Sequence, residues 1–277
     1  MFKNILHTEW FKVKNYRAFW LLLSVTAISY PGINTIFYLS YDEVTNPKAK
    51  GALMAKMLLG NPFKYPEVLH TTAFLSSFFT FIPAIVIIML ITNEYMFKTH
   101  RQNIIDGWKK STFIWGKFLS VVLVTLIVTF FYVIVAFTLG NMASDAAGKE
   151  KMFEQVKYIP LFALQVFAQL SIAFLMGLII RKAFIAYGIY IFYSFIAENI
   201  LGGFLKWKAK SYGIDYGQFL PFEISDRLIP IPGFLGRFNE VDYKLSLAAV
   251  DKHIAYTLAL TTIVWVLSFY IFKKRDL

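Results

Sequence analysis

The sequence has no cysteine among its 277 residues, and charged residues make up only 16% of it. The absence of cysteine excludes disulfides and thiolate metal sites. The scarcity of charge is informative too, because soluble globular domains usually carry about 25% charged residues. A chain with so little charge and with 57% hydrophobic residues is typical of integral membrane proteins.

The motifs of nucleotide-hydrolysing and metal-dependent enzymes are also missing. Residues 107–112, Gly-Trp-Lys-Lys-Ser-Thr, lack both the second glycine and the preceding strand of a phosphate-binding loop. The four histidines form no metal-binding pair at helical spacing. No Gly-x-Ser-x-Gly nucleophile motif occurs. We therefore expect no catalytic residue, no metal site and no enzyme activity in this chain.

Six apolar runs have the length that a transmembrane helix requires, about 20 residues. They cover residues 18–40, 71–92, 113–140, 158–180, 183–205 and 253–272. The runs are continuous rather than alternating, which predicts helices that satisfy their own backbone hydrogen bonds. We predict a single all-α transmembrane domain over residues 1–277.

Basic residues predict the orientation of the chain. The net charge of +11 is interpreted as orientation and lipid contact, not as nucleic-acid binding. An even number of spans places both termini on one side. Basic residues divide equally between the two sets of connections, but those on the terminal side lie close to the span ends, and the long loop 206–252 counts less. We predict cytoplasmic termini and the inner membrane of a bacterium.

Residues 1–17 predict an amphipathic helix that lies in the membrane interface, with Trp10 at the level of the headgroups. Its apolar face would hold Phe2, Ile5, Leu6, Trp10 and Val13. Glu9 falls within this apolar arc. Its carboxylate either pairs with a basic group or a partner, because burying it alone is costly, or reaches water at the edge of the arc.

The predicted outer loop 206–252 contains an apolar stretch, residues 219–235. Its charges and prolines interrupt it too often for a span, so it predicts a re-entrant or interfacial helical hairpin. A folded surface loop with a small core of its own is the alternative. In the first outer loop, Gly51–Leu59 predicts a short surface helix.

Polar side chains inside the predicted spans are candidates for a translocation path. Gln165 and Gln169 share one face of the fourth span, and Glu198 is ionisable. Hydroxyl and amide groups also serve as hydrogen-bond partners between helices, and Glu198 can reach the outer headgroups, so a structural role stays open. The complete candidate set is Thr80, Thr125, Thr129, Gln165, Gln169, Tyr190 and Glu198.

Between the second and third spans lies a polar, basic segment, residues 93–110. Taken as one helix, it places Tyr95, Thr99, Asn103 and Asp106 on one side. The other side then carries Phe97, His100, Arg101, Ile104, Ile105 and Trp108. Such a helix either lies on anionic headgroups or seats in a groove of a soluble motor subunit.

With these features the chain resembles the ABC-2 family of ATP-binding-cassette transporter permeases over essentially its whole length. The resemblance rests on Glu9-Trp-Phe-Lys12, on six spans, on the apolar loop before the last span, and on Asn93-Glu-Tyr with Thr99-x-Arg-Gln-Asn-Ile-Ile-Asp-Gly107. In this family a Glu ends the second span, a Thr follows five residues later, and a Lys often opens the third span. Here these are Glu94, Thr99 and Lys117. Many members have Gly before that Thr, where this chain has Lys98.

The resemblance implies a permease that forms a homodimer or a related heterodimer and binds a separate cytoplasmic ATPase subunit. ATP and Mg²⁺ would be bound by that ATPase, so no cofactor is expected in this chain. The implied fold has six transmembrane helices, an amino-terminal interfacial helix, a cytoplasmic coupling helix and a re-entrant extracytoplasmic hairpin. The implied ATPase-coupling residues are Glu94, Thr99, Arg101, Gln102, Asp106 and Gly107, with Glu9 and Trp10 of the interfacial helix.

The family exports lipids, glycans, peptides and other hydrophobic compounds, and the sequence does not choose among them. Membrane lipids are expected contacts, and nucleic acid is not. Two alternatives remain at this point. The chain is a non-transporting membrane sensor or immunity subunit, or it is an integral-membrane enzyme that modifies lipid. The enzyme would use a polar outer site made of Glu198, Glu223, Asp226 and Arg227.

Overall fold

The computed structural model of this chain describes residues 2–105, 107–212 and 215–274, and every regular element in these residues is helical. The first half contains α1 (Phe2–Lys14), α2 (Arg17–Thr45), α3 (Ala52–Leu59), α4 (Val68–Ser77), α5 (Phe81–Met96), α6 (Thr99–Ile105), α7 (Lys110–Ala143) and α8 (Ala146–Glu150). The second half contains α9 (Tyr158–Ile180), α10 (Ala183–Phe192), the π-helical turn η1 (Tyr193–Ala197), α11 (Glu198–Tyr212), the 3₁₀ turn η2 (Tyr216–Phe219), α12 (Pro221–Asp226), α13 (Gly233–Gly236) and α14 (Glu240–Lys274).

Five of the helices are long and apolar enough to cross a membrane, and the bent pair α4–α5 makes a sixth candidate span. The five single helices are α2, α7, α9, α14 and the continuous helix formed by α10, η1 and α11. The chain is therefore an all-helical membrane protein with five to six candidate spans. The predicted fold class is confirmed at this level.

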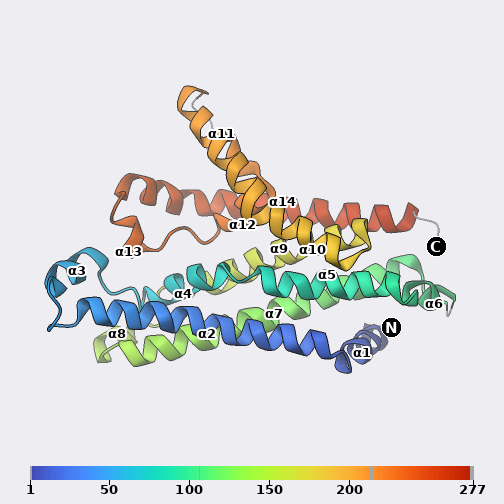
Figure 1. The fold of residues 1–277 in the computed structure, drawn as a ribbon, viewed down its shortest axis with the longest axis horizontal. Coiled ribbons are helices and arrows are strands. Elements are labelled where there is room, and N and C mark those ends of the chain that lie inside the picture. The colour runs from blue at the N-terminus through green and yellow to red at the C-terminus, as the bar shows by residue number, and fades with distance from the viewer. Residues whose placement is uncertain (1, 106, 213–214, 275–277) are drawn as a thin grey trace.

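The spans form a bundle around α9, which packs against α5, α7 and α14. α9 carries apolar side chains around its whole circumference, as expected for a helix surrounded by other helices, and Gln165 and Gln169 are exceptions on one face. Gly177 allows the closest approach, because a Cβ atom at this position would lie only 2.5 Å from Cγ2 of Ile91 on α5. Figure 1 shows the start of α1, the end of α14 and α6 at one end of the bundle, and α3, α8 and α13 at the other.

The second span is broken between Ser77 and Phe81, and its two halves differ in direction by 50°. Pro83 in the first turn of α5 explains the position of the break. Proline has no N–H to donate to the carbonyl of Phe79, and its ring disfavours a helical turn that continues from before it. The break is in the middle of the bundle, where it becomes part of a cavity described below.

The predicted outer loop 206–252 is wrong in its extent. α11 continues to Tyr212, and α14 begins at Glu240, 13 residues before the predicted start at residue 253. Hydropathy marks only the lipid-facing length of a helix, and a helix can continue beyond it. Glu240 and Asp242 lie in the first turn of α14, where negative charge stabilises a helix.

The apolar stretch 219–235 contains α12 and α13, and α12 packs against α9 and α14. It buries Phe222, Ile224, Leu228 and Ile229, so the stretch is not a solvated loop. The predicted helix at Gly51–Leu59 is confirmed by α3, which covers Ala52–Leu59.

Because the chain has no cysteine, single introduced cysteines will report which end of the bundle faces which side. Arg101 on α6 and Lys149 on α8 are both exposed and lie at opposite ends. With cytoplasmic termini, we expect a membrane-impermeant maleimide to label Lys149→Cys in spheroplasts, and Arg101→Cys only after the membrane is permeabilised. The unsubstituted chain gives the background. Labelling of both variants from outside would contradict the bundle topology.

Candidate functional site

The connection between the second and third spans is not one helix, as the sequence predicted, but a sharp turn followed by the short helix α6. α5 ends at Met96, Lys98 adopts a left-handed backbone with φ of 56°, and α6 starts at Thr99. A left-handed residue commonly terminates a helix, and Gly107, with φ of 94°, ends this region in the same way.

The turn overturns the predicted division of residues between two faces. His100 was expected beside Ile105, but His100 is 6% exposed and Ile105 is 78% exposed. The helical phase of α5 does not continue into α6, because the chain reverses at Lys98. Asp106, a predicted coupling residue, lies outside the described residues.

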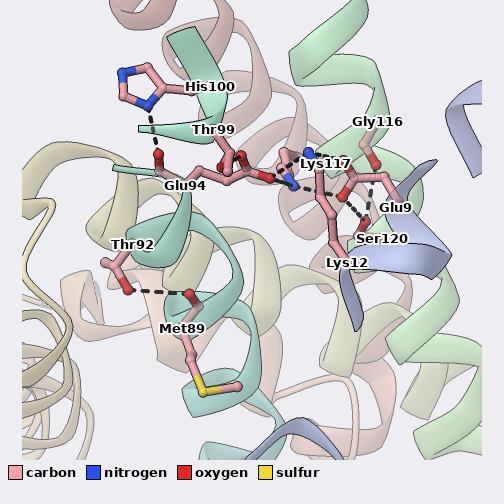
Figure 2. Close-up of polar contacts among 10 residues, drawn as sticks. All are labelled: Glu9, Lys12, Met89, Thr92, Glu94, Thr99, His100, Gly116, Lys117 and Ser120. Carbon is pink, nitrogen blue, oxygen red and sulfur yellow. Dashed lines mark hydrogen bonds and ion pairs between the residues drawn. The ribbon is translucent and has the colours of Figure 1, made fainter. Parts of the chain in front are cut away.

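Behind this turn, the ammonium group of Lys117 lies between two carboxylates (Figure 2). Its Nζ is 2.6 Å from Oε2 of Glu9 on α1 and 2.6 Å from Oε1 of Glu94 on α5. Lys12 on α1 adds a second cation, 2.8 Å from Oε1 of Glu94 and 3.3 Å from Oε1 of Glu9. The hydroxyl of Ser120 donates to Oε2 of Glu9 at 3.2 Å. We call Glu9, Lys12, Glu94, Lys117 and Ser120 the charge cluster.

The charge cluster is deeply buried, since the side chains of Lys117 and Glu94 are only 3% and 4% exposed. Burying isolated charges is costly, and mutual pairing with good geometry offsets that cost. Two ammonium groups and two carboxylates balance each other here. The ring of Phe113 lies 5.3 Å from the Lys117 ammonium and contributes a cation–π contact.

Two contacts attach α6 to the charge cluster. The hydroxyl of Thr99 donates a hydrogen bond to Oε2 of Glu94. Nδ1 of His100 lies 2.6 Å from the backbone carbonyl oxygen of Glu94, which can only accept, so Nδ1 carries the proton. The ring of His100 also packs against Tyr95. The first turn of α6 is therefore held on the end of α5.

The structure divides the predicted coupling residues into two groups. Glu9, Glu94 and Thr99 come together in and beside the charge cluster. Of the two alternatives for Glu9, the structure shows pairing with basic groups and not contact with water at the edge of the arc. Arg101, Gln102 and Gly107 are instead exposed on and after α6. Trp10 is 46% exposed and makes an edge contact with Trp20. Of the predicted apolar face of α1, the other side chains lie outside the described part of the chain: Phe2, Ile5, Leu6 and Val13.

A second polar cluster forms in the middle of the bundle. Gln165 and Gln169 on α9 both donate to Oδ1 of Asp226 on α12, at 2.9 and 2.7 Å. The hydroxyl of Thr80, at the break of the second span, donates to Oε1 of Gln169. With Tyr190, these four side chains line one cavity of ≈ 240 Å³. Four predicted path residues thus share a site with one residue proposed for the alternative enzyme.

The other predicted path residues lie elsewhere. Thr125 and Thr129 are buried and donate to carbonyls of their own helix, to Val121 and Thr125 respectively, which supports a structural role. Glu198 accepts a hydrogen bond from the backbone N–H of Glu223 at 2.6 Å and so attaches α11 to α12. Arg227 pairs with Glu223 and with Asp215. Among the described residues, no group of three or more His, Asp or Glu side chains is arranged for a metal ion.

Sequence reasoning missed the roles of Ser120 and Asp226. Ser120 follows Lys117 by three residues, so the helical period places both on one face of α7, and this signal was available. Lys12 has the same spacing from Glu9. Nothing in the sequence linked Asp226 to Gln165 and Gln169, because they are 61 and 57 positions apart.

Replacing Lys117 by methionine should destabilise the protein by roughly 3–5 kcal/mol, because it leaves two carboxylates buried with a single, partly exposed cation. Thermal unfolding of the full chain in detergent micelles measures the effect. Lys109→Met is the matched control, since Lys109 is exposed near the same helix end. Equal unfolding temperatures for the two variants would show that the charge cluster does not stabilise the fold.

Comparison with known proteins identifies a family for this chain. No curated protein matches this sequence. Residues 55–277 match the profile of a family described as "Protein of unknown function (DUF2705)". The matched region starts within α3 and covers the break of the second span, α6, Lys117 and Asp226. Because the match extends over well more than half of the chain, this protein belongs to the DUF2705 family.

Proposed function

We propose that this chain is the membrane-spanning permease subunit of an ATP-binding-cassette exporter of the ABC-2 type, in the inner membrane of a bacterium. Both termini and α6 face the cytoplasm, where α6 contacts a separate ATPase subunit. The observation that carries the proposal is the buried position of Lys117 between Glu9 and Glu94, at 2.6 Å from each. It joins the interfacial helix, the α5–α6 turn and the start of α7 into one unit.

The exposed surface around α6 has the chemistry of a docking site. Arg101 and Gln102 are exposed on α6, and large apolar side chains next to them are also exposed. Met96 is the last residue of α5, Phe97 lies in the turn after it, and Ile105 is at the end of α6. A short helix with apolar and basic side chains suits a groove on a soluble partner.

The charge cluster supplies the route from this surface to the spans. A force on α6 reaches Glu94 through Thr99 and His100, and Glu94 passes it to Lys117 and Lys12. α1 follows, because Glu9 shares the same Lys117 ammonium. Buried paired charges resist separation, so the joined elements move together.

In this proposal ATP is hydrolysed by another polypeptide, since the sequence has no phosphate-binding loop. The ATPase partner would hold ATP and Mg²⁺. A second permease copy, identical or related, would complete the transporter. The helix α10–α11 offers a surface for it, because its apolar window is the least buried of the candidate spans. On the outer side, α12 and α13 would form the re-entrant hairpin.

The proposal predicts that a nucleotide-binding subunit co-purifies with the tagged full-length chain from its native membranes and that the complex hydrolyses ATP. Arg101→Glu should lower the amount of bound ATPase on the order of tenfold, because it reverses a charge at the contact. The matched control is Lys149→Glu, on the exposed surface of α8 at the opposite end.

Three outcomes would count against the proposal. Absence of any ATP-hydrolysing partner from the unsubstituted chain contradicts the transporter assignment. Equal capture by Arg101→Glu and Lys149→Glu contradicts α6 as the contact. A stable complex whose ATP hydrolysis responds to no compound in reconstituted vesicles would point to a sensor subunit.

A further inference from the structure

The cavity that Asp226 lines lies where two spans depart from regular helix. Thr80 marks the break between α4 and α5, and the π-helical turn η1 supplies Ser194 and Phe195. Phe81 and Phe195 meet edge to face across this site, with ring centroids 5.4 Å apart. π-Helical turns often occur at functional sites, and irregular backbone inside a membrane protein is tolerated where it lines a cavity. Both irregularities therefore point to a binding site.

The walls of the cavity combine aromatic side chains with neutral polar ones, and the charge among its described lining residues has one sign. The aromatic lining residues are Phe74, Phe78, Phe81, Tyr190, Phe195 and Phe222. Asp226 is the acidic residue of the lining, and no lysine or arginine occurs among the described residues that line it. An anion among aromatic faces is the arrangement that recognises organic cations.

Asp226 differs from the other carboxylates nearby because no cation pairs with its negative charge in the described part of the chain. Glu223 and Asp215 are paired with the guanidinium of Arg227. Within the described residues, the carboxylate of Asp226 receives hydrogen bonds from the neutral amides of Gln165 and Gln169 alone, and both end on Oδ1. The residue is exposed although it lines an interior cavity and its neighbours Ser225 and Leu228 are buried. Its accessible surface therefore faces the cavity, with no cation in the described part of the chain to balance it.

We propose that this cavity binds an organic cation with apolar or aromatic substituents, with Asp226 as its counter-ion and the surrounding rings as cation–π partners. The inference deepens the proposed function, because it names the ligand class of the permease. The binding itself depends only on this chain, so it can be tested without the ATPase.

The titration of Asp226 gives the binding a characteristic pH dependence. Asp226 is accessible from the cavity, but its position inside the bundle removes it from most bulk water, and this desolvation raises its pKa to about 7. The nearby carboxylates Glu223 and Glu198 act in the same direction, against the two glutamine hydrogen bonds. Below that pH a proton neutralises the site, and above it the carboxylate is free to pair with a cation. Affinity for a permanent cation should therefore rise with pH by up to about tenfold per unit below pH 7 and level off above it.

α9 faces Asp226 with neutral amides, but the other elements packed around it carry ionisable groups, so variants are needed to assign the effect. They are Glu223 on α12, Arg227 directly after it, Glu198 on α11, Tyr190 on α10, Asp215 before η2 and His253 on α14. Asp226→Asn removes the charge at nearly constant shape and should abolish the pH dependence. Asp226→Glu keeps the charge and should retain it.

The experiment is isothermal titration of the purified full-length chain in micelles with benzyltrimethylammonium, whose charge does not change with pH. Phenylmethanesulfonate is the anion of matched shape, and protein-free micelles give the partition background. We expect saturable binding of the cation only. Asp226→Asn should weaken it by about tenfold or more, whereas Asp42→Asn, at an exposed position of α2, should leave it unchanged.

Equal affinity of the unsubstituted chain and Asp226→Asn would overturn the proposal, as would binding of the sulfonate with equal affinity or no saturable binding of the cation. Each variant is accepted only if its unfolding temperature and elution volume match those of the unsubstituted chain. If Asp226→Asn fails this condition, the pH dependence of the unsubstituted chain decides, because pH-independent binding overturns the assignment of Asp226. Neither result depends on the ATPase, so failure here is distinguishable from failure of the α6 contact.

Discussion

The position of Lys117 between two carboxylates is the constraint on which the cytoplasmic end of this fold depends under the proposed orientation. An ammonium group that is 3% exposed at the start of an apolar helix requires both Glu9 and Glu94. That requirement docks α1 against α7 and fixes the end of α5. It also explains why α6 begins as it does, since Thr99 and His100 bond to the same glutamate. The amino-terminal helix is thus joined to the bundle through Glu9.

α5 connects the two polar sites of the molecule. Glu94 is in its last turn, and Thr80 precedes its first residue. Its 16 residues make a rod about 24 Å long. α9 packs closely along this rod at Gly177 and carries Gln165 and Gln169 toward Asp226. In the proposed permease, a displacement at α6 would therefore reach the cavity through one rigid helix, and the break at residues 78–80 is the point where it can bend.

The two sites use charge in opposite ways. In the charge cluster, two cations balance two carboxylates, which favours one fixed arrangement and suits a mechanical joint. In the cavity, Asp226 is held by neutral amides and stays accessible, which suits a site that exchanges protons or ligands. The same residue type is therefore structural at Glu94 and a candidate for binding at Asp226, and the distinction comes from what surrounds each carboxylate and not from its position along the chain.

The sequence by itself determined the membrane class and the absence of a phosphate-binding loop, and it predicted six spans, because hydropathy and motif spacing are local properties. The structure gives five single helices and one bent pair as candidates. It also singled out Glu9, because a carboxylate on an apolar face either pairs or must reach water. Only the tertiary structure decided which partner it has. Glu9 and Lys117 are 108 positions apart, and Asp226 meets glutamines more than 50 positions away. The tertiary structure also decided the reversal at Lys98, which a helical period cannot predict. Contacts of Thr99 and His100 with Glu94 favour the turn over a continued helix.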